Sequence, residues 1–227
     1  MDPLRRWYTG IVFIGIKANG TTDLKETLKG MQSTDSLRMM VMASLFAALI
    51  AAGAFLAIPV GPVPIYLANF FVMLAGLILG PRWGSAAVSA YLLAGTLGLP
   101  VFAGGTGGIG RLLGPTGGYL LAYLPAVFLA GLISKRAKPS LAWDVMAMLV
   151  ATTVIYGMGV PWLKTITGMT WGKSLAIGVI PFLIGDGIKI ATAIPVVRLV
   201  RSMIFPPETE RMVMPSHPEV PTFHEHH

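Results

Sequence analysis

The sequence contains no cysteine and very little charge for its length. Without cysteine, the chain can form neither a disulfide framework nor a thiolate metal site. Charged residues make up 12% of the 227 positions, whereas 54% are hydrophobic, and the mean hydropathy is +0.71. The exterior of a water-soluble fold needs more charge than this composition provides. We therefore predict an all-α, polytopic membrane protein that works within the lipid bilayer.

Histidine is absent from the apolar part of the chain, because all four histidines follow Ser216. No Ser-His-Asp, Cys-His or metal-helix pattern occurs in the apolar stretches, so the sequence does not favour an intramembrane hydrolase. It also has no phosphate-binding loop that ends in Gly-Lys-Ser/Thr, so any ATP hydrolysis must take place on another chain. We expect no enzyme activity, no cofactor and no bound metal.

Six apolar stretches are long enough, or nearly so, to cross a bilayer as helices. They cover about Leu37–Ile58, Ile65–Gly80, Gly84–Leu99, Gly117–Ser134, Leu141–Leu163 and Ser174–Val200. Proline, glycine and charged residues separate them, as is typical of connections between helices. We predict six transmembrane helices within a membrane domain of residues 36–203.

Two tails flank this domain. Residues 1–35 are expected to form a cytoplasmic tail, in which Met31 offers an alternative start to Met1. Residues 204–227 are polar and rich in proline, a composition that predicts disorder.

The basic residues predict the orientation of the chain. They flank apolar runs and do not form a basic stripe with interleaved aromatic residues, so the net charge of +7 does not indicate a nucleic-acid partner. The side that holds the N-terminus has seven near the membrane: Arg38, Arg82, Lys135, Arg136, Lys138, Arg198 and Arg201. The opposite side has three: Arg111, Lys164 and Lys173. Because cytoplasmic loops carry the excess of Lys and Arg, both termini are predicted to be cytoplasmic.

Only two ionisable residues lie deep within the apolar stretches, Asp186 and Lys189. An ionisable group at membrane depth costs about 2.5–3.5 kcal/mol, so each is a candidate functional residue. The two are three positions apart and share one face of a helix. They form a candidate ligand-binding pair. The alternative is a mutually neutralising pair that packs the bundle, although apolar residues would pack it at lower cost.

A glycine-rich segment, Gly98–Tyr119, separates the third and fourth stretches. Its glycines permit positive φ and close approach of the backbone to a ligand. Flexible linkers are usually polar, whereas this segment has apolar residues between its glycines. We expect a lid that folds back into the membrane, with Gly105 and Thr106 near the ligand and Arg111 available for a carboxylate.

Three alanines, Ala43, Ala47 and Ala51, form a stripe of small residues along the first stretch. Such a stripe lets another helix approach closely, and that helix can belong to a partner protein or to the same bundle. Two further ligand-contact candidates have equally ordinary explanations. Tyr156 can anchor a helix at the membrane interface, and Asn69 can hydrogen-bond between helices.

Several motifs, taken together and in order, resemble the BioY family of biotin-specific substrate-binding subunits (S components) of energy-coupling-factor (ECF) transporters. The resemblance covers about residues 36–203. Its pieces are Pro62-Val63-Pro64-Ile65, Leu74-Ala75-Gly76, Gly98–Gly105, Gly114–Leu120 and Gly185-Asp186 with Lys189.

The resemblance implies a plasma-membrane subunit that binds biotin near its outer face. It also implies association with a transmembrane coupling (T) subunit and two cytosolic ATPase subunits. Asp186 and Lys189 would contact biotin, and the alanine stripe would dock on the T subunit. The chain departs from the family at Tyr66-Leu67-Ala68-Asn69, where Thr-Leu-Gln-Thr is frequent, so Asn69 is a stand-in for any contact made there.

Two other functions remain open at this point. One is an S component for a different vitamin. The other is a non-transport intramembrane enzyme or channel-like protein that uses Asp186 and Lys189 as a proton relay.

Overall fold

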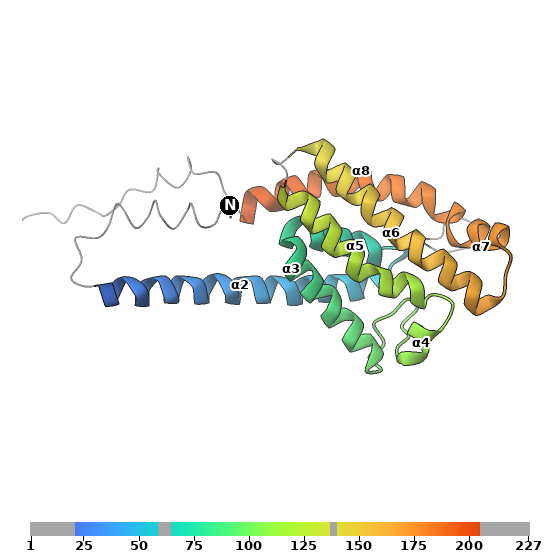
Figure 1. Cartoon of the computed structure of the whole chain (residues 1–227), viewed down its shortest axis with the longest axis horizontal. Helices are drawn as coiled ribbons and strands as arrows, with labels where there is room; N and C mark the ends of the chain where they lie inside the picture. Colours follow the sequence, from blue (N-terminus) through green and yellow to red (C-terminus); the bar gives the residue numbers. More distant parts are fainter. Residues whose placement is uncertain (1–20, 59–64, 137–139, 205–227) are drawn as a thin grey trace, which may run out of the picture. The chain divides into compact units, whose positions relative to one another are not determined.

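The computed structural model describes residues 21–58, 65–136 and 140–204, and in these ranges the chain is almost entirely helical (Figure 1). The elements are α2 (Thr21–Phe55), β1 (Ala57–Ile58), β2 (Ile65–Tyr66), α3 (Ala68–Thr96), α4 (Ile109–Leu113), α5 (Gly117–Arg136), α6 (Leu141–Thr167), α7 (Trp171–Gly178) and α8 (Ile180–Ile204). The two strands form a single antiparallel pair, with Ala57 opposite Tyr66 and Ile58 opposite Ile65.

The chain divides into two compact units, Met1–Val41 and Met42–His227. The described part of the first unit is the beginning of α2, so helix already forms within the segment predicted to be a cytoplasmic tail. The second unit contains the rest of α2 and all the other elements. Apart from residue 204, the tail predicted to be disordered lies outside the described residues.

Helix α3 is broken at Gly80, where φ is +77° and ψ is −174°. Glycine tolerates this conformation, and the next residue, Pro81, cannot continue the hydrogen-bonded ladder of the preceding turn. A Cβ placed on Gly84 would lie 3.0 Å from the carbonyl oxygen of Ala75, whereas nine residues of straight helix would separate the two by about 13 Å. The chain therefore folds back at Gly80, and the two halves of α3 pack against each other.

Five helical segments are long and apolar enough to cross a membrane: Asp35–Phe55, Ala68–Thr96, Gly117–Lys135, Leu141–Thr167 and Trp171–Arg201. The second contains both the second and the third predicted stretches, which the break in α3 separates. The fifth combines α7 and α8, which meet at Val179. The predicted all-α membrane character agrees with this architecture, while the count of six crossings stays a prediction.

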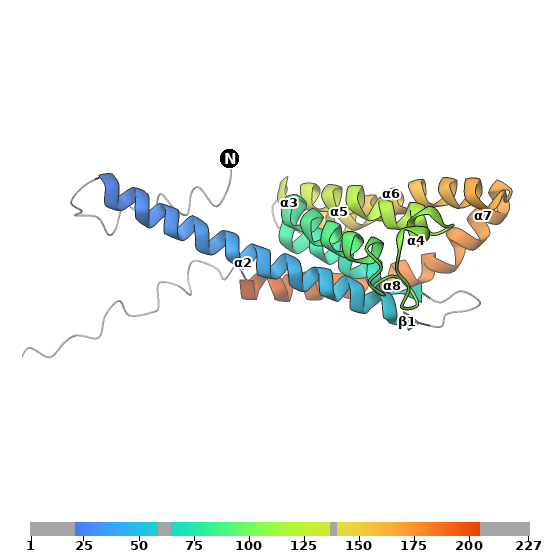
Figure 2. The same ribbon diagram turned by 90° about the horizontal axis from the view of Figure 1, so that it is seen from below.

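Small residues bring α3, α5 and α6 close together, and the three helices lie side by side (Figure 2). A Cβ on Gly76 of α3 would lie 2.8 Å from the carbonyl oxygen of Val127 on α5. A Cβ on Gly131 of α5 would lie 2.4 Å from the nitrogen of Pro81, at the break in α3. Close backbone approach of this kind is how membrane helices gain packing energy without a hydrophobic driving force between them.

Candidate ligand-binding site

Asp186 and Lys189 lie on α8 and are buried, with 5% and 4% of their surface exposed. The Lys189 ammonium nitrogen is 3.3 Å from Asp186 Oδ1, an ion pair between residues three positions apart. The predicted sharing of one helix face is therefore correct. Because each side chain is buried, the pair must be satisfied by other polar groups as well.

Two residues from other helices complete a hydrogen-bonded group of four side chains. The Tyr156 hydroxyl on α6 donates to Asp186 Oδ2, and the Lys189 ammonium on α8 donates to the amide oxygen of Asn69 on α3 at 2.7 Å. Asn69 is the second residue of α3, directly after the β1–β2 pair. We call Asn69, Tyr156, Asp186 and Lys189 the polar group. The structure thus brings together four predicted site residues from three helices.

Two tyrosines of α5 border the polar group, and neither was predicted to do so. Tyr123 lies near Asp186, and Tyr119 lies near Tyr156. The Tyr119 hydroxyl also donates to the carbonyl oxygen of Gly178 at 3.1 Å. Tyr119 ends the glycine-rich segment and Tyr123 follows one helical turn later, and this spacing is the signal that could have identified them.

The glycine-rich segment is folded into a compact turn followed by the short helix α4. Phe102 and Thr106 pair as an isolated β-bridge, and Gly105 between them has φ of +69°. The Arg111 guanidinium donates to the Thr106 hydroxyl at 2.8 Å and to the carbonyl oxygen of Ala103 at 3.3 Å. Among the described residues, the three predicted contacts of this segment therefore group with each other and not with the polar group.

Phe102 holds this segment against the helices. It is 1% exposed, and its ring packs edge-to-face on Tyr91 of α3 with centroids 5.5 Å apart. A Cβ on Gly95 would lie 2.2 Å from the Phe102 ring, so only glycine leaves room for it. On the other side of the segment, the Trp162 indole donates to the carbonyl oxygen of Gly114 at 2.9 Å. These contacts hold the segment against the C-terminal parts of α3 and α6.

The polar group places hydrogen-bond donors and acceptors close together. Asp186 supplies a carboxylate acceptor, Lys189 supplies an ammonium donor, and Asn69 and Tyr156 can each donate and accept. These four side chains already bond to one another, so a ligand must exchange existing hydrogen bonds for new ones. A ligand that combines N–H donors, a carbonyl and a carboxylate has the chemistry to do so.

The family model described as BioY family matches residues 25–205, most of the chain. The chain belongs to the BioY family. The Pyrococcus horikoshii protein named Probable biotin transporter BioY is 44% identical over 153 residues, which are 67% of this chain and 90% of that protein. The Thermotoga maritima biotin transporter BioY is 40% identical over 157 residues, or 69% of this chain and 92% of that protein.

A solved structure also resembles this BioY chain. It is the crystal structure of the S-component for biotin from an ECF-type ABC transporter, with 32% sequence identity and a TM-score of 0.69. The match covers 74% of this chain and 93% of that one. The resemblance inferred from the sequence motifs is confirmed, and the chain is a multi-pass membrane protein.

The small-residue face of α2 is only partly open in this BioY chain. Ala43 is 6% exposed, whereas Ala47 and Ala51 are half-buried. The neighbouring small residues are exposed; they are Ser44, Ala48 and Ala52. The most accessible small residues therefore lie about one residue, roughly 100° around the helix, from Ala43, Ala47 and Ala51.

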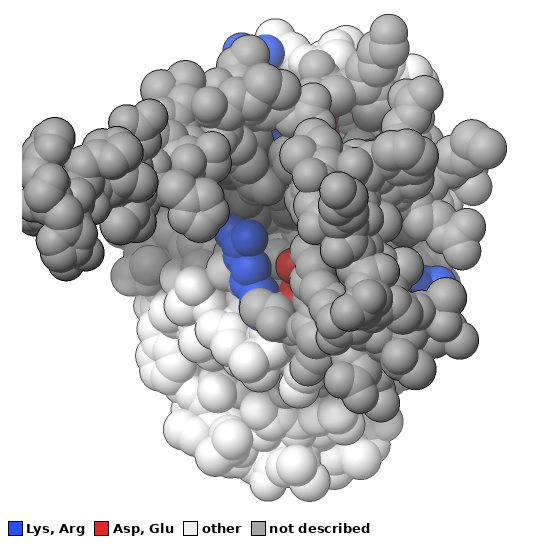
Figure 3. Space-filling model, turned by 90° about the vertical axis from the view of Figure 1, so that its left-hand side faces the viewer, with Lys and Arg blue, Asp and Glu red and all other residues white. Residues whose placement is uncertain are grey.

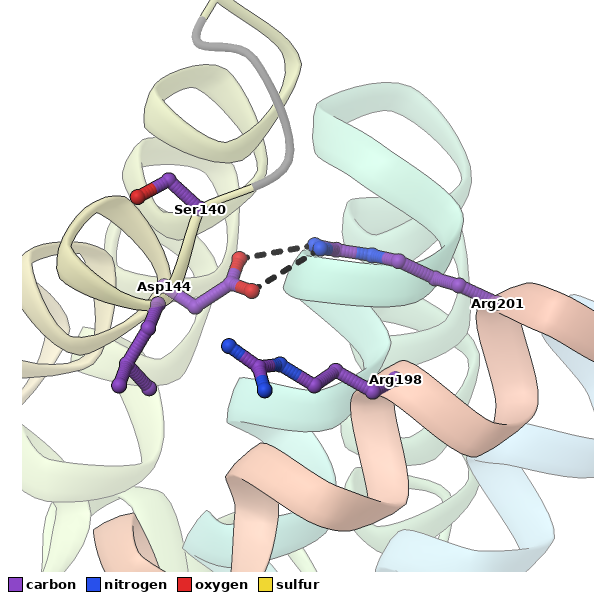
Figure 4. Close-up of a pocket in the computed structure, with 5 residues that line it drawn as sticks. Ser140, Asp144, Arg198 and Arg201 are labelled. Carbon is purple, nitrogen blue, oxygen red and sulfur yellow. Dashed lines mark hydrogen bonds and ion pairs between the residues drawn. The ribbon is translucent and has the colours of Figure 1, made fainter.

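A second polar network lies at the other end of the helices. The Arg201 guanidinium on α8 forms a bidentate ion pair with Asp144 on α6, with two hydrogen bonds of 3.0 Å (Figure 4). It also donates to the carbonyl oxygen of Leu77 at 2.9 Å and to the Ser134 hydroxyl at 2.6 Å. The Leu77 carbonyl needs the hydrogen bond from Arg201 because Pro81, four residues later, has no N–H to donate to it.

Proposed function

We propose that this chain is the biotin-binding S component of an ECF-type uptake transporter in the plasma membrane. The observation that carries the proposal is the buried polar group, which combines an acid, a base, an amide and a phenol in a chain that belongs to the BioY family. Buried ionisable groups in a membrane protein are costly and mark ligand or ion pathways.

Biotin has functional groups that match the polar group. Its ureido ring has two N–H donors and one carbonyl acceptor, and its aliphatic chain ends in a carboxylate. The Asp186 carboxylate accepts from ureido N–H groups, and Asn69 and Tyr156 can donate to the ureido carbonyl. Tyr119 and Tyr123 supply aromatic surface for the apolar rings. Gly105 and Thr106, in the glycine-rich segment, would cover the ligand from outside.

Two cations compete for the biotin carboxylate, Lys189 in the polar group and Arg111 in the glycine-rich segment. Biotin amide, which lacks the carboxylate charge, distinguishes them. Wild type is expected to bind the amide more weakly than biotin, and the difference should largely disappear when the partner cation is replaced. The comparison is made in Arg111→Ala and Lys189→Ala.

The proposed topology has six crossings, with both termini in the cytoplasm. The two halves of α3 supply two crossings, since the chain folds back at Gly80. Side-chain contacts support the assignment, made from the charge count, of which residues lie at the cytoplasmic end. Lys135 lies over Gly80, and Arg201 reaches Leu77, so residues from the predicted cytoplasmic ends meet at one end of the helices.

The proposed partners are a T subunit and two cytosolic ATPases, because this chain carries no nucleotide-binding motif. The accessible small residues of α2 would form the docking face for the T subunit. Of the predicted stripe, Ala47 and Ala51 are accessible enough to take part, and Ala43 would support them from within the bundle.

The test is equilibrium binding of labelled biotin to the purified full chain in detergent, without partner subunits. Saturable binding of one biotin per chain, competed by unlabelled biotin and not by other vitamins, is expected. Competition by a different vitamin at lower concentration would favour an S component of another specificity. A chain that binds no vitamin but conducts protons in vesicles would be a relay or channel instead.

A further inference from the structure

A pocket of about 160 Å³ lies at the end of the helices opposite the polar group. It is lined by Ser140, Leu141, Asp144, Arg198 and Arg201. Figure 4 shows Arg198 and Arg201 reaching from α8 toward α6, with Arg198 beside the Asp144–Arg201 pair. Figure 3 views the side of the molecule on which α8 ends, and a small patch of Lys or Arg atoms is visible there beside Asp or Glu atoms. We propose that this pocket binds the phosphate of an anionic phospholipid.

The charges of the pocket leave one cation available. The Asp144 carboxylate uses both its oxygens to accept from Arg201, so the charges of this pair balance. Within the described ranges, the Arg198 guanidinium has no hydrogen-bond or ion-pair partner, although it faces the pocket. An arginine presents a planar fork of donors that matches two phosphate oxygens. The pocket thus has a net positive charge and an unused donor set for an anion.

The walls of the pocket favour a lipid over a soluble anion. Leu141 lines the pocket and is 43% exposed, and Trp143, in the same turn of α6, is 45% exposed. A free phosphate gains nothing from these side chains, whereas the glycerol and the upper acyl chain of a phospholipid can pack on them. Tryptophan is also enriched at the level of the lipid headgroups. The proposed topology places this end at the cytoplasmic leaflet, whose anionic lipids attract Lys and Arg.

The test uses the full chain in detergent, titrated with phosphatidylglycerol, phosphatidylcholine or inorganic phosphate. Native mass spectrometry measures the occupancy of each. Arg198→Gln is expected to lower phosphatidylglycerol affinity about fivefold or more, the factor that corresponds to one basic residue at an anionic surface. Arg198→Lys should recover part of the loss, because it restores the charge without the fork.

The matched control is Arg82→Gln, since Arg82 is an exposed basic residue that does not line the pocket. It should leave phosphatidylglycerol affinity unchanged, and both glutamine variants should keep wild-type biotin binding. Equal lipid affinity in Arg198→Gln and Arg82→Gln would overturn the proposal. So would inorganic phosphate or phosphatidylcholine binding as tightly as phosphatidylglycerol, because the site would then select a free anion or a neutral lipid.

Discussion

Replacing Arg201 with methionine tests the network that joins four helices (α3, α5, α6 and α8) at the end opposite the polar group. The substitution keeps an apolar stem of similar length and removes the guanidinium. Four hydrogen bonds disappear: two to Asp144, one to the Leu77 carbonyl and one to the Ser134 hydroxyl. The Leu77 carbonyl keeps one donor, because the Ser134 hydroxyl lies 3.2 Å from it. The main loss is therefore the partner of the Asp144 carboxylate.

The expected magnitude follows from the burial of the pair. Removing one partner of a buried ion pair costs about 3–5 kcal/mol, because an uncompensated charge remains. The Asp144 side chain is 8% exposed, but that of Arg201 is 21% exposed, so water can reach part of the space that Arg201 leaves. We therefore expect Arg201→Met to lower the free energy of unfolding by about 3 kcal/mol, the lower end of that range.

The assay is unfolding in mixed micelles with a rising fraction of dodecyl sulfate, followed by circular dichroism. Arg198→Met is the matched control, since Arg198 comes from the same helix and lines the same pocket, and it has no hydrogen-bond or ion-pair partner among the described residues. It should change stability by less than about 0.5 kcal/mol. The double variant Asp144→Leu with Arg201→Met removes both charges and should recover most of the loss. A double variant as unstable as the sum of its single variants would refute the reasoning.

Three further predictions concern ligand, partner and topology. Asp186→Asn should lower biotin affinity by at least roughly 30-fold in equilibrium dialysis, because loss of a charged partner in a dehydrated site costs about 2–5 kcal/mol; near-wild-type affinity would make Asp186 structural. Ala47→Leu should keep biotin binding and weaken capture of the T subunit in a pull-down, and the reverse pattern would assign Ala47 to internal packing. In this cysteine-free chain, a cysteine at position 140 should be labelled from the cytoplasm and one at position 170 from outside, whereas labelling from one side would contradict the topology.

Asp186 and Lys189 could be predicted because ionisable residues are energetically costly at membrane depth and are therefore rare in apolar stretches. An acid and a base three positions apart in an apolar stretch lie on one face of a helix, so residue type and spacing together indicate a candidate site. Asn69 and Tyr156 were candidates with ordinary alternatives, since one polar residue in a helix does not reveal its partner. Their hydrogen bonds to Lys189 and Asp186 depend on helix packing, which joins residues up to 120 positions apart.

The Arg201 network could not be predicted from the sequence. Arg201 is one of the basic residues that predict the orientation of the chain, and nothing in the sequence pairs it with Asp144. Arg201 also donates to the Leu77 carbonyl, which lacks its helical donor because Pro81 has no N–H. The sequence predicts a connection between the stretches that end at Gly80 and begin at Gly84, but it does not show which side chain satisfies that carbonyl.

The alanine stripe shows a second limit of prediction from sequence. A repeat of four residues identifies small residues on one side of a helix, but not which side faces its own bundle. In α2 the outcome depends on neighbours distant in sequence, and Ala43 is buried while Ala48 is exposed. The exposed face could be found only once the packing of α2 was known.

The most direct test of the central claim is the binding of labelled biotin to purified wild type and to Lys189→Met, each as the full chain in detergent. The proposal predicts one tightly bound biotin per wild-type chain. In the folded variant it predicts an affinity lower by at least roughly 30-fold, because Asp186 and Asn69 lose their shared donor. Equal biotin affinity in the two proteins would contradict the assignment of the polar group as the ligand site.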